Sequence, residues 1–193
     1  GASPITESIL VDAMKTFGSD FVQAYGLTET TGAITVLEAQ DHDPGGPRAH
    51  LLRSCGRAVA NHKIKIVDKD SGAEVPEGEV GEICVIGPQT MKCYWRNDEA
   101  TNECYTDDWF HTGDAGYLAD GYLYIHDRVK DMIISGGENI YPTQVEATLI
   151  SHPDIEQACV VPLPDEIKGS KPVVFIVVRR RQRRQRRGVS LHR

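Results

Sequence analysis

Short apolar runs separated by glycine, proline and aspartate fill the middle of the chain. HKIKIVD at 62–68, EVGEICVIG at 79–87 and GYLYIHD at 121–127 either alternate apolar with polar residues or stay apolar over the length of a strand. The residues between these runs are those that form turns. The pattern therefore predicts a β-rich region over about residues 47–126.

The N-terminal segment has a longer period. Apolar side chains recur at helical spacing within PITESILVDAMKTF at 4–17. Their positions are Ile5, Ile9 or Leu10, Ala13 and Phe17. Residues 20–25 then have the pattern of a short strand that leads into the glycine of YGLTE. We expect a helix, a strand and a loop in that order.

Several local signals follow one another in DRVKDMIISGGENIYP at 127–142. The apolar run at 132–134 is too short for a helix and predicts a buried strand. Gly136 and Gly137 break it, because glycine accepts positive φ and close backbone contact. Pro142 suits the first turn of a helix. The apolar positions of that helix are Val145, Leu149 and Ile150.

Two further strands are expected before residue 178, the second of them in PVVFIVV, so residues 131–178 should form strand, helix, strand and strand. The predicted fold class is α/β, more specifically α+β. The charged stretch between Asp127 and Asp131 is, on its own, a solvated connection.

Composition is ordinary for a globular chain, with 40% hydrophobic and 25% charged residues among 193. No run approaches the roughly 18 apolar residues of a membrane span, and the first residues lack the pattern of a signal peptide. We expect a cytoplasmic protein. Five cysteines without a CxxC pair predict reduced structural thiols, and neither a zinc site nor a disulfide framework.

The net charge of −7 conceals an asymmetry. Residues 179–193 contain eight of the 21 basic residues and no acidic one, which leaves 13 basic against 28 acidic residues over 1–178. Clustered arginines attract phosphate. The run RRRQRRQRRG at 179–188, however, has no aromatic residue for base stacking and no periodic pattern. We therefore predict a disordered tail, and we do not expect nucleic acid as a partner.

Four strings stand in a recognisable order: QAYGLTETTG at 23–32, GEICVIGP at 81–88, WFHTGD at 109–114 and DRVKDMIISGGENIYP at 127–142. Short motifs recur by chance, but this order across most of residues 1–178 is specific. The chain resembles the adenylate-forming enzymes, a family of acyl-CoA synthetases, firefly luciferases and nonribosomal peptide adenylation domains. Its last string most resembles the fatty-acyl and aryl-acid CoA ligases.

The resemblance implies a domain plan. Residues 1–127 would be the β-rich C-terminal portion of a large AMP-binding domain, and residues 128–178 the start of a small α+β domain. The family's phosphate-binding loop is expected upstream of residue 1. The family's adenylating lysine has no counterpart in residues 179–193, which contain no lysine. We expect little or no activity from this chain alone, because charge developing at phosphorus needs such donors.

The implied reaction is ATP-dependent activation of a small-molecule carboxylic acid to an acyl-adenylate, followed by thioester formation with coenzyme A. ATP or AMP, Mg²⁺ and coenzyme A are the implied cofactors and co-substrates. The alternative is a noncatalytic remnant of an adenylating domain whose basic tail binds nucleic acid or an acidic surface.

Family roles attach first to YGLTE. The resemblance places Tyr25 against the adenine ring and Gly26 in the same nucleotide-binding motif. It also places Thr28 on a phosphate and Glu29 near Mg²⁺. A phenol offers a flat stacking face, and a carboxylate is the hard oxygen ligand that Mg²⁺ prefers. Without the family, these residues form a strand-to-helix turn in which Thr28 and Glu29 make a capping arrangement.

The resemblance makes Asp114 the ribose ligand, because a carboxylate can accept hydrogen bonds from both ribose hydroxyls. The alternative is an Asx turn beside a glycine. Arg128 would contact the ribose or phosphate side of the adenylate. On its own it would pair with Asp127 or Asp131 at the surface, where ion pairs contribute only about 0–1 kcal/mol.

The remaining roles concern movement and the second substrate. The resemblance makes Lys130 the hinge about which the small domain rotates between two working states. Gly136 and Gly137 match the segment beside which the pantetheine arm of coenzyme A passes. Residues 109–111, including His111, are interpreted as packing around the motif, because a histidine without a nucleophile or ligand cluster is usually structural.

Overall fold

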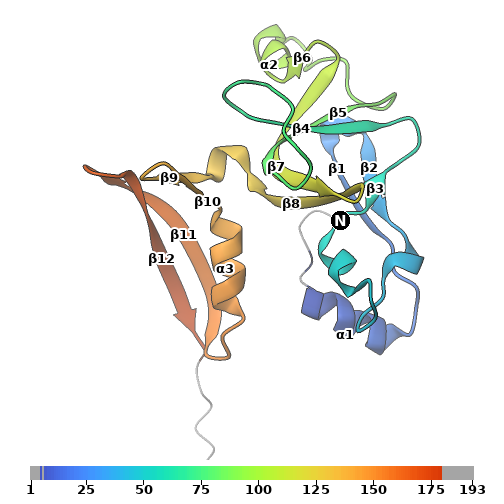
Figure 1. Ribbon diagram of the computed structural model, residues 1–193, viewed down its shortest axis with the longest axis vertical. Coiled ribbons are helices and arrows are strands. Elements are labelled where there is room, and N and C mark those ends of the chain that lie inside the picture. Colours follow the sequence, from blue (N-terminus) through green and yellow to red (C-terminus); the bar gives the residue numbers. More distant parts are fainter. Residues whose placement is uncertain (1–4, 6, 180–193) are drawn as a thin grey trace, which may run out of the picture. The chain divides into compact units, whose positions relative to one another are not determined.

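The computed structural model describes residue 5 and residues 7–179 (Figure 1). The chain divides into two compact units, residues 1–131 and residues 132–193. The predicted arginine-rich tail lies outside the described residues, apart from Arg179. Within the part that is described, no helix is long and apolar enough to cross a membrane.

The first unit begins with the predicted helix, α1, Glu7–Phe17. Leu10 is its buried residue, whereas Ile9 and Phe17 are exposed. The helix contacts a short 3-10 helix, Ala49–Arg53, and Arg53 Nε bonds to Glu7 Oε2 at 2.8 Å. α1 is therefore held mainly through one face and one surface ion pair.

Three antiparallel strands form the first sheet, in the order β1-β2-β3. Their bounds are Gln23–Leu27, Gly32–Leu37 and Arg57–Ala58. The strand predicted at 20–25 begins later and continues through Gly26, which stays paired because the ladder shifts register between Tyr25 and Gly26. A 3-10 turn, Thr28–Thr30, joins β1 to β2.

Five antiparallel strands form the second sheet, in the order β4-β5-β7-β6 with β8 also paired to β7 (Figure 1). Their bounds are Lys63–Val67, Gly81–Ile86, Tyr105–Thr106, Trp109–Ala119 and Tyr122–Arg128 for β4, β5, β6, β7 and β8. The strand predictions for β4, β5 and β8 are confirmed. β7 was not predicted, and neither was helix α2, Asp98–Glu103, whose N-cap Asn97 accepts from Ala100 N.

Among the described residues, three apolar clusters hold the first unit together, and Tyr25 packs against two of them. Each buried aliphatic side chain contributes about 1.5–3 kcal/mol by leaving water. The strands that carry Tyr25 and its neighbours are consequently fixed by the core. The buried members of these two clusters are Ile34, Val85 and Phe110 in one and Ile66, Ile83 and Leu123 in the other, while Leu37, Leu51 and Tyr122 form the third.

The second unit starts with a tight hairpin between β9, Ile133–Ser135, and β10, Glu138–Ile140. Gly136 and Gly137 form its two-residue turn with φ of +60° and +87°. Turns of this kind need positive φ at both positions, which glycine supplies. The strand predicted at 132–134 is confirmed within one residue, with Ile133 buried but Ile134 exposed.

Helix α3, Pro142–Ile150, begins at the proline as predicted. Strands β11, Ile155–Asp165, and β12, Gly169–Val178, then form a long antiparallel hairpin. Glu146 on α3 accepts from Val160 N at 2.8 Å, which ties the helix to β11. The predicted β-rich α+β class is confirmed.

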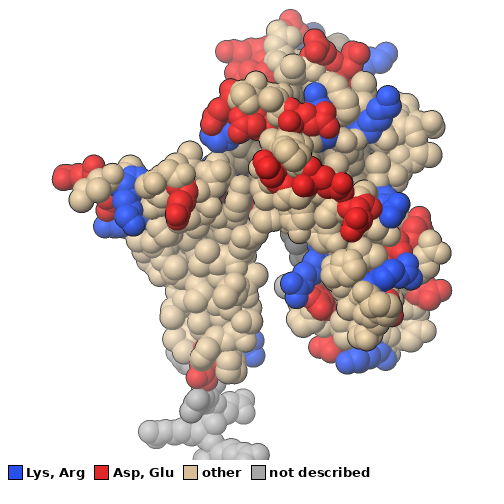
Figure 2. Space-filling view, in the orientation of Figure 1, with Lys and Arg blue, Asp and Glu red and all other residues tan. Residues whose placement is uncertain are grey.

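The β11–β12 hairpin carries an uncovered apolar strand. Phe175 on β12 is 63% exposed, and its neighbours on both sides are exposed as well. Figure 2 shows few charged side chains on this unit away from the hairpin tip. The described part of the second unit thus leaves apolar β12 side chains in contact with solvent.

Candidate functional site

Three of the predicted nucleotide-binding residues meet in the first unit. The Tyr25 hydroxyl donates to Asp114 Oδ2 at 2.6 Å, and Arg128 Nε donates to Asp114 Oδ1 at 2.8 Å. The side chains come from β1, β7 and β8. Asp114 is almost fully buried, whereas half of the Arg128 side chain is exposed. The carboxylate of the ion pair is therefore buried, whereas its guanidinium partner remains accessible to solvent.

Strand pairing explains the ion pair. Asp114 lies directly opposite Arg128 in the β7–β8 ladder. Opposite side chains of antiparallel strands lie about 5 Å apart, so a carboxylate and a guanidinium there readily pair. Asp114 itself is a strand residue whose carboxylate binds these two side chains, rather than the Asx turn considered as an alternative.

Burial and the two hydrogen-bonding partners shift the pKa of Asp114 in opposite directions. Burial is the largest influence and raises the pKa of this carboxyl above its usual range, while the bonds from Tyr25 and Arg128 lower it. Burial, followed by the negative charge of Asp114, raises the pKa of Tyr25 well above that of a free phenol. Tyr25 is therefore a hydrogen-bond donor at physiological pH and not a proton source.

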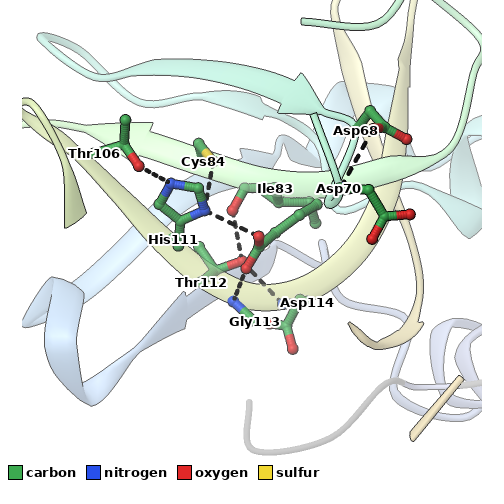
Figure 3. A network of polar contacts seen from close by, with 10 residues as sticks. Asp68, Asp70, Ile83, Cys84, Thr106, His111, Thr112, Gly113 and Asp114 are labelled. Carbon is green, nitrogen blue, oxygen red and sulfur yellow. Dashed lines mark hydrogen bonds and ion pairs between the residues drawn. The ribbon is translucent and has the colours of Figure 1, made fainter. Parts of the chain in front are cut away.

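A bulge in β7 presents Asp114. Glu82 pairs with Ala115 and Cys84 pairs with His111, so residues 112–114 stand out of the β5–β7 ladder. Gly113 takes φ of +71° within this bulge. The Thr112 hydroxyl accepts from Asp114 N at 3.1 Å and donates to Ile83 O at 2.8 Å (Figure 3). The main chain leading to the carboxylate is thereby held by side chains.

Glu29 is held by a residue that the sequence did not suggest. The Tyr94 hydroxyl donates to Glu29 Oε1 at 2.9 Å, and Met91 N donates to Glu29 O at 2.7 Å. Burial and the bond to Glu29 raise the pKa of Tyr94 to about 12. Across the described residues, no group of three His, Cys, Asp or Glu side chains could hold a metal. A single carboxylate such as Glu29 is nevertheless compatible with Mg²⁺, because this ion keeps several water ligands and binds substrate phosphates.

The turn after β1 is capped by Thr30 and not by Thr28. Thr30 Oγ1 accepts from Leu27 N at 2.9 Å and also bonds to Leu27 O and Gly32 O. The alternative in which Thr28 and Glu29 made a capping arrangement is therefore wrong. Thr28 is exposed, so its hydroxyl faces solvent at the start of the turn.

The close approach of β2 leaves no room for a side chain at Gly26. A Cβ built there would lie 1.9 Å from Gly32 O of the paired strand. The close approach coincides with the register shift between Tyr25 and Gly26. Gly26 therefore positions Tyr25 through the backbone and brings no functional group of its own.

The predicted hinge and coenzyme A residues occupy other elements. Lys130 is exposed in a 3-10 turn, Val129–Asp131, next to the boundary between the two units. Gly136 and Gly137 are exposed in the β9–β10 turn, where Gly136 N donates to Lys168 O at 3.0 Å. A methyl at Gly137 would meet nothing within 4 Å.

Comparison with known proteins identifies the chain's relatives. A family model described as AMP-binding enzyme matches residues 1–95, and one described as AMP-binding enzyme C-terminal domain matches residues 144–190. The chain belongs to the AMP-binding enzyme family. It is 41% identical to a fatty acid–[acyl-carrier-protein] ligase of Streptomyces coeruleorubidus, over 92% of this chain and 34% of the relative.

Two further proteins also match the chain over most of its length. A medium/long-chain-fatty-acid–CoA ligase of Mycobacterium tuberculosis is 42% identical over 93% of this chain and 30% of its own length. The solved o-succinylbenzoate CoA synthetase of Bacillus subtilis matches with a TM-score of 0.82 and 36% identity, over 94% of this chain and 36% of that one. The family prediction is confirmed, and the chain spans about a third of the length of these relatives.

Three residues of this candidate site were not predicted from the sequence: Glu82, Tyr94 and Thr112. One of them left a signal. Glu82 is the acidic residue at the start of the apolar run EICVIG, and a glutamate is rarely buried unless it is paired. Tyr94 left none, because its partner Glu29 is 65 residues away.

Proposed function

We propose that this chain forms the adenylate-binding part of an AMP-forming acid–thiol ligase. The observation that carries the proposal is the buried Asp114 carboxylate, bonded to Tyr25 and Arg128 at the end of a bulge. The Bacillus subtilis relative has been solved with its acyl-adenylate intermediate and with ATP and magnesium ion, which supports nucleotide binding by this region.

In the proposed reaction, a substrate carboxylate oxygen attacks the α-phosphorus of ATP. The bond to the β-phosphate oxygen breaks, and acyl-AMP and pyrophosphate result. The thiol sulfur of coenzyme A then attacks the acyl carbon, loses its proton and expels AMP. A fatty or aryl acid is the proposed substrate class, in keeping with the fatty-acid and 2-succinylbenzoate ligases among the relatives.

Asp114 is proposed to accept hydrogen bonds from the ribose hydroxyls. Its two oxygens have about four acceptor sites, and Tyr25 and Arg128 use two of them. Arg128, with half of its side chain exposed, can reach the ribose or phosphate side without giving up its bond to Asp114. We assign Tyr25 to the adenine side and Thr28 to a phosphate oxygen.

Glu29 is the proposed carboxylate ligand for Mg²⁺, which when bound neutralises charge on the phosphates of ATP. Tyr94 holds Glu29 Oε1 and leaves Oε2 without a hydrogen bond among the described residues. We assign Lys130 to a hinge and the Gly136–Gly137 turn to the path of the pantetheine arm. These two assignments rest on the family match.

Calorimetric titration of the full chain with AMP tests the proposal. Asp114→Asn removes the charge but keeps the size, and charge-assisted hydrogen bonds are worth about 1.5–3 kcal/mol, so AMP affinity should fall about ten- to a hundredfold. Asp120→Asn, the same change at an exposed position following β7, is the matched control. Equal affinities of wild type and Asp114→Asn, or no AMP binding by the folded wild type, would contradict the proposal.

A further inference from the structure

A second carboxylate supports the bulge that presents Asp114. Glu82 on β5 accepts from His111 Nδ1 at 2.9 Å through Oε2 and from Gly113 N at 3.2 Å through Oε1. One side chain thereby bridges the first and third residues of the His111–Gly113 stretch. Glu82 and His111 are largely buried, with side chains 15% and 21% exposed.

The bulge explains why such a support is needed. Residues 112–114 have left the β5–β7 ladder, so their N–H groups cannot be satisfied by regular pairing with β5. Glu82 accepts from Gly113 N, and the Thr112 hydroxyl accepts from Asp114 N. Two side chains thus replace the hydrogen bonds that the ladder does not make, and both act on residues next to the carboxylate.

His111 is fixed on both sides. Its Nε2 lies 3.0 Å from Thr106 Oγ1, and its Nδ1 lies 3.4 Å from Cys84 Sγ in addition to Glu82 (Figure 3). Both ring nitrogens of the imidazole are therefore engaged by protein side chains, and the ring orients the Glu82 carboxylate. The predicted packing role of His111 thus consists of its contacts with Glu82, Cys84 and Thr106.

We propose that Glu82, oriented by His111, is a positioning residue that sets the Asp114 carboxylate for ribose recognition. This inference rests on the proposed nucleotide function. Glu82 touches no reacting atom and acts through the Gly113 N–H, one residue before Asp114. A misplacement of a binding group by about 1 Å can cost about a hundredfold, so the loss of this support should be measurable.

The experiment compares AMP with 2′,3′-dideoxy-AMP, which lacks both ribose hydroxyls. Glu82→Met removes both acceptors at similar size, and Glu82→Gln keeps one acceptor for Gly113 N. Glu77→Met is the matched control, because Glu77 Oε1 accepts from another glycine N–H, that of Gly121, at 3.3 Å. Calorimetric affinities are measured on the full chain for every variant.

Glu82→Met is expected to weaken AMP binding about tenfold while leaving dideoxy-AMP affinity nearly unchanged. Glu82→Gln should recover most of the loss, and Glu77→Met should behave as wild type. Combined with Asp114→Asn, Glu82→Met should add no further loss, because both act on one interaction. A folded Glu82→Met chain that keeps the wild-type preference for AMP would overturn the inference. If Glu82→Met does not fold, Glu82→Asp, which cannot span both partners, replaces it.

Amide hydrogen exchange gives a readout without ligand. Glu82→Met should accelerate exchange over residues 111–115, and Glu77→Met should accelerate it only around Gly121. Unchanged protection at 111–115 in Glu82→Met would sink the positioning role even if the chain bound no AMP. Failure of the proposed function would instead appear as a wild-type chain, with a protected bulge, that does not distinguish AMP from its dideoxy analogue.

Discussion

At the scale of single residues, the proposed ribose contact requires Asp114 to stay anionic in a site that disfavours charge. Burial raises its pKa, and the nearby Asp127 and Glu29 carboxylates add to that effect, while Tyr25 and Arg128 oppose it. Two donors on one buried carboxylate are what keep it ready to accept hydrogen bonds. The site is consequently sensitive to pH on the acid side.

This sensitivity gives a testable pH dependence. Only the ionised carboxylate accepts two ribose hydroxyls, and its pKa lies above the ordinary aspartate value of 3.8. AMP affinity should therefore be complete well above the raised pKa and decline as pH falls through it. The measurement is the ratio of wild-type to Asp114→Asn affinity between pH 8 and pH 4, which cancels titration of the phosphate. A ratio that stays constant down to pH 4 would show that Asp114 does not titrate as expected.

Single residues also show which parts of the candidate site can be predicted from the sequence. Asp114 and Arg128 were predicted from their motifs, and the structure brings them together because they face each other across two neighbouring strands. Glu82, Tyr94 and Thr112 were not predicted. Their partners lie on other elements or on the main chain of a bulge, and no short string records such contacts.

At the scale of elements, the strands with regular alternation were predictable and the irregular ones were not. β4, β5 and β8 show a clear apolar pattern, whereas β7 contains the bulge at 112–114, which interrupts its period. The β9–β10 hairpin was missed although Gly136-Gly137 is a known two-residue hairpin signal. The predicted order of strand, helix, strand and strand over residues 131–178 has no place for β10, which follows the glycine pair.

Gly26 offers a test of how tightly the first sheet is built. Gly26→Ala places a methyl against the Gly32 carbonyl of the paired strand, so the free energy of unfolding should fall by about 1–3 kcal/mol. Gly46→Ala is the control, because the nearest atoms to its methyl belong to the Asp43 side chain, which can rotate away, and not to a paired strand. Urea denaturation of both variants checks this. Equal stability of the two would show that β1 and β2 can separate without cost.

At the scale of the whole molecule, the chain consists of two units joined next to Lys130. The sequence predicted their composition, a β-rich part and then a smaller α+β part. It could not give the strand order of the five-stranded sheet, in which β7 lies between β5 and β6 and also pairs with β8. That order depends on pairing between distant segments, which the local pattern of each strand does not encode.

Limited proteolysis tests the junction. Lys130 is exposed in a short 3-10 turn, whereas Arg128 is paired in β8, so trypsin should cleave after Lys130 before it cleaves after Arg128. Mass spectrometry should detect residues 1–130 as an early fragment. Lys130→Gln should abolish this fragment and leave the other tryptic cleavages unchanged. Early cleavage inside β4 or β5 instead would place the weakest point elsewhere.

The bulge in β7 has a further consequence for how such a site can arise. Between the positions paired with Cys84 and Glu82, β7 has two residues more than a regular ladder would. Two is an even number, and side chains alternate between faces with a period of two, so the insertion leaves the inward and outward sets on both sides of it unchanged. Insertion or deletion of two residues can thus add or remove a bulge that presents a carboxylate, without exchanging the two faces of the sheet.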